Sequence, residues 1–297
     1  MRPAAGAVAL PTARSRAHDY VALAKPRLNV LVVASALAGY GMAGGEAARA
    51  TLLLATVIGT ALVASGASAF NQVLERRTDA LMHRTRQRPL PDGRLQAREA
   101  IVVASLMSSV GLVILVLGAN LLSAAAALVT LVTYTAIYTP LKRYSSFATV
   151  IGAIPGALPP VIGWTAATNA LTPGAWILFG IVFLWQLPHF LAIAWIYRED
   201  YARAELQMLP VIEPDGRSTG RQAVVYAVAL LPVSLAPTLI GMAGTSYFFG
   251  ALALALLFVA LAVKFALTRS IPDARRLFFG SITYLPLLWI LMLADRT

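Results

Sequence analysis

The sequence lacks cysteine and has little charge. Without cysteine, the chain forms no disulfide, has no thiolate nucleophile and cannot ligate an iron–sulfur cluster. Charged residues make up only 12% of the 297 residues, whereas hydrophobic residues make up 59%, and the mean hydropathy is +0.73. A water-soluble domain of this length could not bury so much apolar surface in one core. The composition therefore predicts a protein that is solvated by a lipid bilayer.

Long apolar runs recur along most of the chain. A helix that crosses a bilayer needs about 20 mostly apolar residues. Runs of this kind lie near residues 28–46, 51–74, 100–118, 121–139, 148–166, 174–196, 222–240, 245–267 and 276–294. We therefore expect an all-α membrane protein with about nine transmembrane helices.

Acidic residues are scarce, and the formal net charge is +11. If the N-terminus is cytoplasmic, all 24 Lys and Arg residues except Arg49 and Arg296 lie in cytoplasmic segments. Basic residues near helix ends are retained on that side, so this distribution predicts a cytoplasmic N-terminus and an odd number of helices. Because the basic residues flank apolar runs and form no nucleic-acid recognition module, we expect membrane lipid and an anionic substrate as partners, and no nucleic acid.

The first 24 residues differ from the rest. They contain Arg and much Ala but no long apolar core, which argues against a secretory signal. We interpret residues 1–24 as a short, poorly ordered cytoplasmic tail, with a transit peptide as the alternative. Residues 25–297 are then a single transmembrane domain.

The end of the second apolar run holds the clearest chemical motif. Asn71, Glu75 and Asp79 are spaced four residues apart, so that their side chains lie along one stripe of a helix. Such a stripe can hold Mg²⁺, which prefers one or two carboxylates together with phosphate oxygens. Arg84 and Arg88 follow and offer guanidinium groups for a diphosphate. The alternative is an ordinary cytoplasmic helix end, where Glu and Arg pair and positive charge sets topology.

Two further polar segments follow predicted cytoplasmic helix ends. Asp200 and Tyr201 come after the sixth apolar run and repeat the mixture of acids and bases. Tyr138, Lys142 and Arg143 come after the fourth run and provide cations for a departing diphosphate, although alone they are ordinary topology anchors. Two acidic clusters on one membrane face suggest two halves of a site for a metal-bound anion.

Polar and helix-breaking residues also occur within apolar runs. Residues 152–160 contain two glycines and three prolines, which in membranes mark close helix packing or a broken helix that lines a cavity. Trp185, Gln186 and His189 lie in the sixth run. A histidine inside a span is costly and indicates function, such as contact with haem iron or a propionate, or acid–base chemistry, unless it only bonds a neighbouring helix.

Taken together, these motifs resemble the UbiA superfamily of intramembrane prenyltransferases and, through the stretch from Trp185 to Phe190, its haem-using branch. The resemblance extends by motif from Tyr20, through Lys25-Pro26-Arg27, to Val211. Two positions depart from the pattern. Glu75 stands where many relatives carry Asp, and Glu205 stands where Gly is expected, which puts the local loop conformation in question.

The resemblance implies transfer of a farnesyl group from farnesyl diphosphate, with addition of water, to a vinyl group of haem B, which gives haem O. It implies Mg²⁺ as cofactor, haem B as substrate, and a bacterial inner-membrane location with the active site toward the cytoplasm. It further implies a downstream haem A synthase or oxidase assembly factors as partners. The metal-binding and catalytic residues it implies are Asn71, Glu75, Asp79 and Asp200. The implied substrate-binding residues are Arg84, Arg88, Lys142, Arg143, Tyr138, Trp185, Gln186, His189 and Tyr201.

Three other functions remain open from the sequence. A prenyltransferase for a quinone precursor or chlorophyll would share the fold. A secondary transporter would place charged residues deep in several helices, whereas most ionisable residues here lie at predicted helix ends. A non-catalytic haem-binding membrane protein would depend on His189 and not on Glu75 or Asp79.

Overall fold

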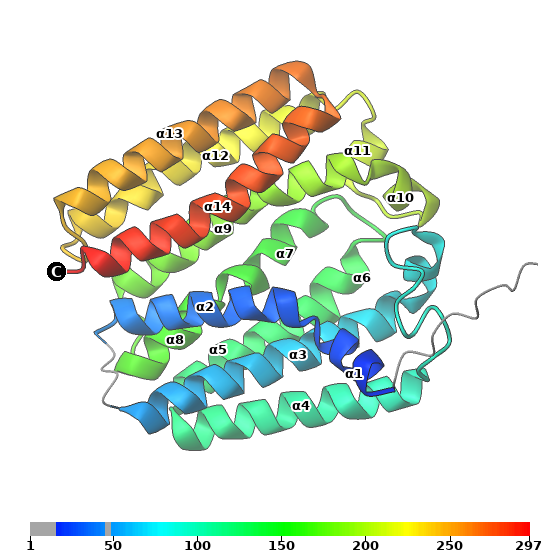
Figure 1. Ribbon diagram of the computed structural model, residues 1–297, viewed down its shortest axis with the longest axis horizontal. Coiled ribbons are helices and arrows are strands. Elements are labelled where there is room, and N and C mark those ends of the chain that lie inside the picture. Colours follow the sequence, from blue (N-terminus) through cyan, green and yellow to red (C-terminus); the bar gives the residue numbers. More distant parts are fainter. Residues whose placement is uncertain (1–15, 45–48) are drawn as a thin grey trace, which may run out of the picture.

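The computed structural model describes residues 16–44 and 49–297, and within them the chain is helical and contains no strand. In this part of the chain, nine helical segments are long and apolar enough to cross a membrane. Their bounds are Arg16–Met42, Ala50–Leu81, Ala97–Gly118, Leu121–Leu141, Ala148–Thr168, Pro173–Ile196, Arg217–Leu239, Thr245–Thr268 and Ile271–Ala294. The predicted all-α membrane protein with about nine transmembrane helices is confirmed (Figure 1).

The predicted tail is partly structured. Residues 1–15 lie outside the described residues, but residues 16–24 form helix α1 (Arg16–Ala24), which packs against α3 (Ala50–Leu81). Arg94 Nε donates to Asp19 Oδ1 at 3.0 Å, and Gln72 Nε2 donates to the Leu23 carbonyl at 2.9 Å. The expectation of a poorly ordered segment is therefore wrong for these nine residues, because buried polar contacts hold them on the bundle.

The first half of the bundle contains α2 (Pro26–Met42), α3, α4 (Ala97–Gly118) and α5 (Leu121–Val132). Only two residues separate α4 from α5. Asn120 makes this connection possible, because its Oδ1 accepts from the Ser123 amide at 2.9 Å and caps α5. Its Nδ2 donates to the Thr165 carbonyl at 2.8 Å, which ties the turn to a later helix.

The chain then continues through irregular helices. A π-helical turn (Thr133–Tyr138) and α6 (Thr139–Leu141) extend α5, and α7 (Ala148–Ala157) and α8 (Pro159–Thr168) form one span that breaks at Pro159. The helix α8 is buried from Pro159 to Ala166. A Cβ on Gly163 would lie 1.7 Å from the Ala36 carbonyl oxygen of α2. In the Gly- and Pro-rich run itself, a Cβ on Gly152 would lie 2.4 Å from Tyr138 Cε2 and one on Gly156 2.1 Å from Gln186 Oε1, so the predicted close packing is confirmed there.

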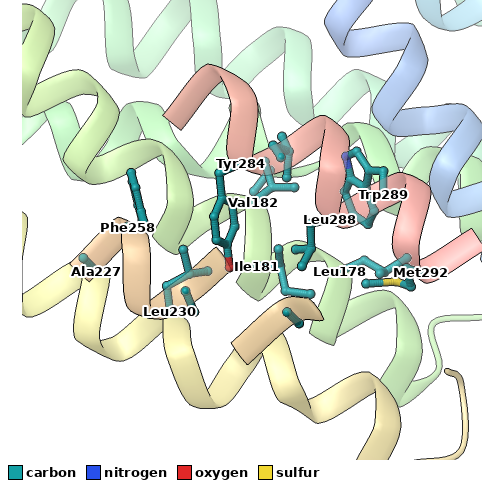
Figure 2. Packing of buried hydrophobic residues seen from close by; sticks show 14 of the residues in the cluster. Leu178, Ile181, Val182, Ala227, Leu230, Phe258, Tyr284, Leu288, Trp289 and Met292 are labelled. Atoms are coloured by element: carbon teal, nitrogen blue, oxygen red, sulfur yellow. The ribbon is translucent and has the colours of Figure 1, made fainter. Parts of the chain in front are cut away.

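The second half consists of α9 (Pro173–Ile196), α10 (Arg198–Arg203), α11 (Leu209–Ile212), α12 (Arg217–Leu239), α13 (Thr245–Thr268) and α14 (Ile271–Ala294). Figure 2 shows their packed interior, where Leu178 and Ile181 of α9 meet Leu230 of α12 and Leu288 of α14. Within this core, Tyr247 Oη donates to the Ser234 carbonyl at 2.6 Å, so α12 and α13 are also joined by a buried hydrogen bond.

Polar residues gather at one end of the bundle, which we call the polar end. It comprises residues 16–25, 75–98, 139–147 and 197–217, and in Figure 1 it is the side on which α1, α6, α10 and α11 lie, opposite the C-terminus. Segments far apart in the sequence meet there, because spans that alternate in direction return the chain to the same end. The polar end therefore contains the candidate site.

Close packing of α8 on α2 generates a prediction. Gly163→Ala should lower the melting temperature of the detergent-purified protein by several degrees, because the new methyl group overlaps the Ala36 carbonyl and the helices must separate, at a cost of about 1–3 kcal/mol. Gly180→Ala is the control, since its Cβ would lie 3.2 Å from Val233 Cγ1, the end of a side chain that can move. Equal melting temperatures for the two variants would contradict the packing argument.

Candidate active site

The predicted stripe on α3 points into the polar end. Asn71 and Asp79 are buried and Glu75 is half-buried, whereas the neighbouring Arg76 and Arg77 are exposed. Asn71 Oδ1 accepts a hydrogen bond from Lys25 Nζ at 2.9 Å, and its Nδ2 donates to Thr139 Oγ1 at 3.1 Å. The first polar residue of the stripe is thereby fixed between α2 and α6.

Each carboxylate of the stripe is paired with a cation. Lys142 Nζ donates to Glu75 Oε1 at 2.7 Å and lies 4.2 Å from the centre of the Tyr138 ring. Arg88 Nη1 donates to Asp79 Oδ2 at 2.7 Å. Burial alone would lower the pKa of Lys142, but the Glu75 carboxylate outweighs it and raises that pKa well above its ordinary value. Lys142 therefore stays protonated at neutral pH.

Asp200 reaches the same place from the other half of the chain. Its carboxylate accepts from the backbone amides of His83 at 3.2 Å and Arg84 at 3.4 Å, and it pairs with Arg203. Burial opposes ionisation of Asp200, but these donors outweigh it and hold the pKa of the carboxyl below its usual value. The segment 82–88 thus connects the two acidic motifs, since its amides bind Asp200 while Arg88 binds Asp79.

Of the two remaining cations that the sequence analysis assigns to the site, Arg84 lies in it and Arg143 does not. Arg84 lies over Tyr197, with 4.8 Å from its guanidinium carbon to the ring centre, and its Nη2 is 3.4 Å from Tyr201 Oη. Together with Lys25 and Arg88 it lines a cavity of about 250 Å³. Arg143 is exposed and, within the described chain, contacts none of the acidic residues. Proximity in sequence to Lys142 therefore does not place Arg143 in the site.

The oxygen atoms of the acidic and amide side chains at the polar end are suitable ligands for a hard divalent cation. Asp79 Oδ1 is buried and has no hydrogen-bond partner among the described residues, although the other oxygen of the same carboxylate is paired. A buried carboxylate oxygen without a partner is costly, and a metal ion would satisfy it. In the described residues, no three His, Cys, Asp or Glu side chains are gathered closely enough to form a metal site by themselves. Amide and diphosphate oxygens would have to complete the coordination.

Trp185, Gln186 and His189 do not join this cluster. Gln186 Nε2 donates to the Ala153 carbonyl at 2.8 Å and holds α9 against α7. Trp185 and His189 face α14, where Trp185 Nε1 donates to the Ser281 carbonyl at 2.8 Å and His189 Nδ1 lies 2.7 Å from Ser281 Oγ. The predicted residues therefore form two groups, one at the polar end and one within the span of α9.

The loop around Glu205 explains one departure from the family pattern. Glu205 has φ of 55°, in the left-handed region that favours glycine, so the backbone keeps the expected conformation with an acidic side chain in place. The neighbouring Gln207 amide donates to the Lys142 carbonyl at 2.9 Å and positions that lysine. Thr139 and Arg203 were missed as site residues, because a threonine and one more arginine give no distinct signal in sequence.

Comparison with known proteins agrees with this architecture. The model of the UbiA prenyltransferase family matches residues 32–285. The protein named protoheme IX farnesyltransferase of Solibacter usitatus is 50% identical over 288 residues, covering 94% of this chain and 99% of the relative. The proteins of the same name in Salinibacter ruber and Myxococcus xanthus are 44% and 42% identical and cover 93% and 98% of this chain, and 98% of each relative.

Solved structures share the fold at low sequence identity. A digeranylgeranylglyceryl phosphate synthase superposes with a TM-score of 0.78 at 15% identity, covering 94% of this chain and 98% of the other. A UbiA homolog from Archaeoglobus fulgidus bound to GPP and Mg²⁺ has a TM-score of 0.63 at 16% identity, covering 92% and 99%. The nine spans and these matches together establish that the chain is an integral membrane enzyme and belongs to the UbiA prenyltransferase family.

Proposed function

We propose that this enzyme transfers the farnesyl group of farnesyl diphosphate, with addition of water, to a vinyl group of haem B and so produces haem O. The observation that carries the proposal is the polar end, where a buried Asp79 oxygen that has no partner in the described part of the chain lies beside Arg88 and close to the Glu75–Lys142 pair. The relatives described above are named for farnesyl transfer to protoheme IX, which supports the choice of donor and acceptor.

The first step breaks the allylic carbon–oxygen bond of farnesyl diphosphate, and the electron pair leaves with the diphosphate. Negative charge then grows on the departing group, and cations that are already in position stabilise it. Lys142 and Arg88 are held by carboxylates, and Arg84 lies against two tyrosines, so these three cations are already gathered at the polar end. Arg143 is exposed and would act only through its longer-range charge.

Asn71, Glu75, Asp79 and Asp200 are the residues that would hold Mg²⁺, which when bound neutralises charge on the diphosphate. All four of these side chains already contact a cation of the protein: Asn71 accepts from Lys25, Glu75 pairs with Lys142, Asp79 with Arg88, and Asp200 with Arg203. With metal and diphosphate bound, Glu75 and Asp79 would hold the metal, and Lys142 and Arg88 would donate to the phosphate oxygens.

The second step joins the farnesyl carbon to the vinyl group of haem B. The vinyl π electrons form the new carbon–carbon bond, which leaves a cation on the carbon next to the porphyrin. Water adds there and gives its proton to the departed diphosphate, which leaves the hydroxyethylfarnesyl side chain. Tyr138 and Tyr134 have ring centres 5.4 Å apart beside Lys142, and their π faces suit the allylic cation.

The distribution of charge supports a location and an orientation. The polar end contains most of the basic residues, so we place it at the cytoplasmic face of a bacterial inner membrane. Residues 25–297 would act as one transmembrane domain. Its product would pass to a downstream haem A synthase or to oxidase assembly factors.

Metal removal should abolish turnover. Purified protein in detergent, mixed with haem B, farnesyl diphosphate and Mg²⁺, should yield haem whose mass is increased by farnesyl plus water, and chelation should stop this reaction until Mg²⁺ is restored, because unneutralised diphosphate is a poor leaving group. The measurement is haem extraction followed by mass analysis. Unchanged haem from a folded protein would point to a different prenyl acceptor.

Asp79→Asn should reduce turnover by about 10²–10³-fold, since it removes one of the carboxylates that would hold Mg²⁺ against the charge of the departing diphosphate. Haem association should stay largely intact, which separates a transferase from a non-catalytic haem-binding protein. Asp215→Asn is the matched control, because Asp215 is exposed and pairs with Arg217, away from the candidate site. Equal turnover of the Asp79 variant and the wild type would remove Asp79 from the site.

A further inference from the structure

His189 has an ordered environment that diphosphate ionisation does not require. It lies in α9, seven residues before the helix ends at Ile196, or about two helical turns from the polar end. Its ring is half-buried and lies against α14. The residue is thus close to the site along the helix but separate from the acidic cluster.

The hydrogen bonds around His189 define which ring nitrogen has the proton. Ser281 Oγ donates to the Phe278 carbonyl at 2.5 Å, and a hydroxyl has only one proton to give. The 2.7 Å contact between Ser281 Oγ and His189 Nδ1 is then a bond in which the imidazole N–H donates. Nε2 keeps its lone pair, and no group of the described chain donates a hydrogen bond to it.

Two aromatic rings fix the plane of the imidazole. Trp185 stacks on it with 5.3 Å between ring centres and an angle of 21°, and Phe278 stacks on it at 5.0 Å and 26°. Trp185 is itself tied to the Ser281 carbonyl at 2.8 Å. The imidazole is therefore held in one orientation and one tautomer, with a neutral nitrogen available.

The geometry points to His189 Nε2 as the ligand that binds the iron of haem B, with Ser281 as its positioning residue. This inference rests on the proposed function, in which haem B is the acceptor. Histidines that bind metals almost always donate their other ring N–H to a fixed partner, and the His189–Ser281 bond has this form. A neutral histidine that offers a lone pair in an apolar span is otherwise costly.

Iron ligation would also determine which acceptor reacts. An anchor about 10 Å along α9 from its end would keep the macrocycle near the polar end, where the diphosphate is proposed to bind. A porphyrin without iron would lack this anchor. Farnesylation of metal-free protoporphyrin should therefore be at least about tenfold slower than that of haem B, because the porphyrin would lose the affinity that the iron–histidine bond supplies.

The test is resonance Raman spectroscopy and haem titration of the full-length protein in detergent with ferrous haem B. The wild type should show an iron–histidine stretching band, which His189→Ala should lose and added imidazole should restore. Ser281→Ala should shift the band and weaken haem binding by about 10–100-fold. Thr283→Ala is the matched control on α14, because its hydroxyl is exposed and donates to the Phe279 carbonyl of its own helix. His83→Gln should keep the band.

Persistence of the band in His189→Ala, or its loss in His83→Gln, would overturn the inference. If His189→Ala does not fold, Ser281→Ala decides, and an unshifted band with unchanged haem affinity would reject the role of this pair. A wild type that forms haem O without an iron–histidine band overturns ligation alone. A wild type with the band that makes no farnesylated haem supports ligation and overturns the proposed function.

Discussion

The polar end depends on one constraint: a carboxylate at the end of a membrane bundle must be matched by a cation or by N–H donors. Glu75 is matched by Lys142, Asp79 by Arg88, and Asp200 by Arg203 and two backbone amides. These contacts join α3 to Lys142 at the end of α6 and to the segment 82–88, and they join that segment to α10. The same groups that neutralise the acids here are the groups that a diphosphate requires, so folding and substrate binding use the same charges.

Close packing of small residues brings together the helix ends that carry these charged side chains. Lipid gives little drive for helices to associate, so contacts such as Gly163 against Ala36 and Gly66 against Ser108 bring the backbones together. The π-helical turn (Thr133–Tyr138) leads into α6, and Lys142 at the end of α6 lies over the Tyr138 ring. Irregular helix geometry therefore occurs next to the candidate site.

Helix α9 connects the two halves of the proposed reaction. Its end leads directly into α10 and Asp200, and two turns earlier it presents His189 against Ser281 of α14. Three residues before His189, Gln186 holds α7, which follows Lys142 in the chain. Helix α9 thus fixes the distance between the polar end, where farnesyl diphosphate is proposed to bind, and His189, where haem B is proposed to bind. A fixed distance suits a reaction that must join two large apolar substrates away from water.

The sequence by itself determined the membrane class, the number of spans and the stripe of Asn71, Glu75 and Asp79, because apolar length and helical periodicity are local properties. It also marked Asp200 and His189, through the cost of placing such residues beside or within a bilayer. Only the tertiary structure decided that α1 folds onto α3, that Lys142 turns inward while Arg143 is exposed, and that Ser281 meets His189 across 92 residues of chain. These outcomes depend on contacts between distant segments, and no local pattern encodes which side chains such contacts bring together.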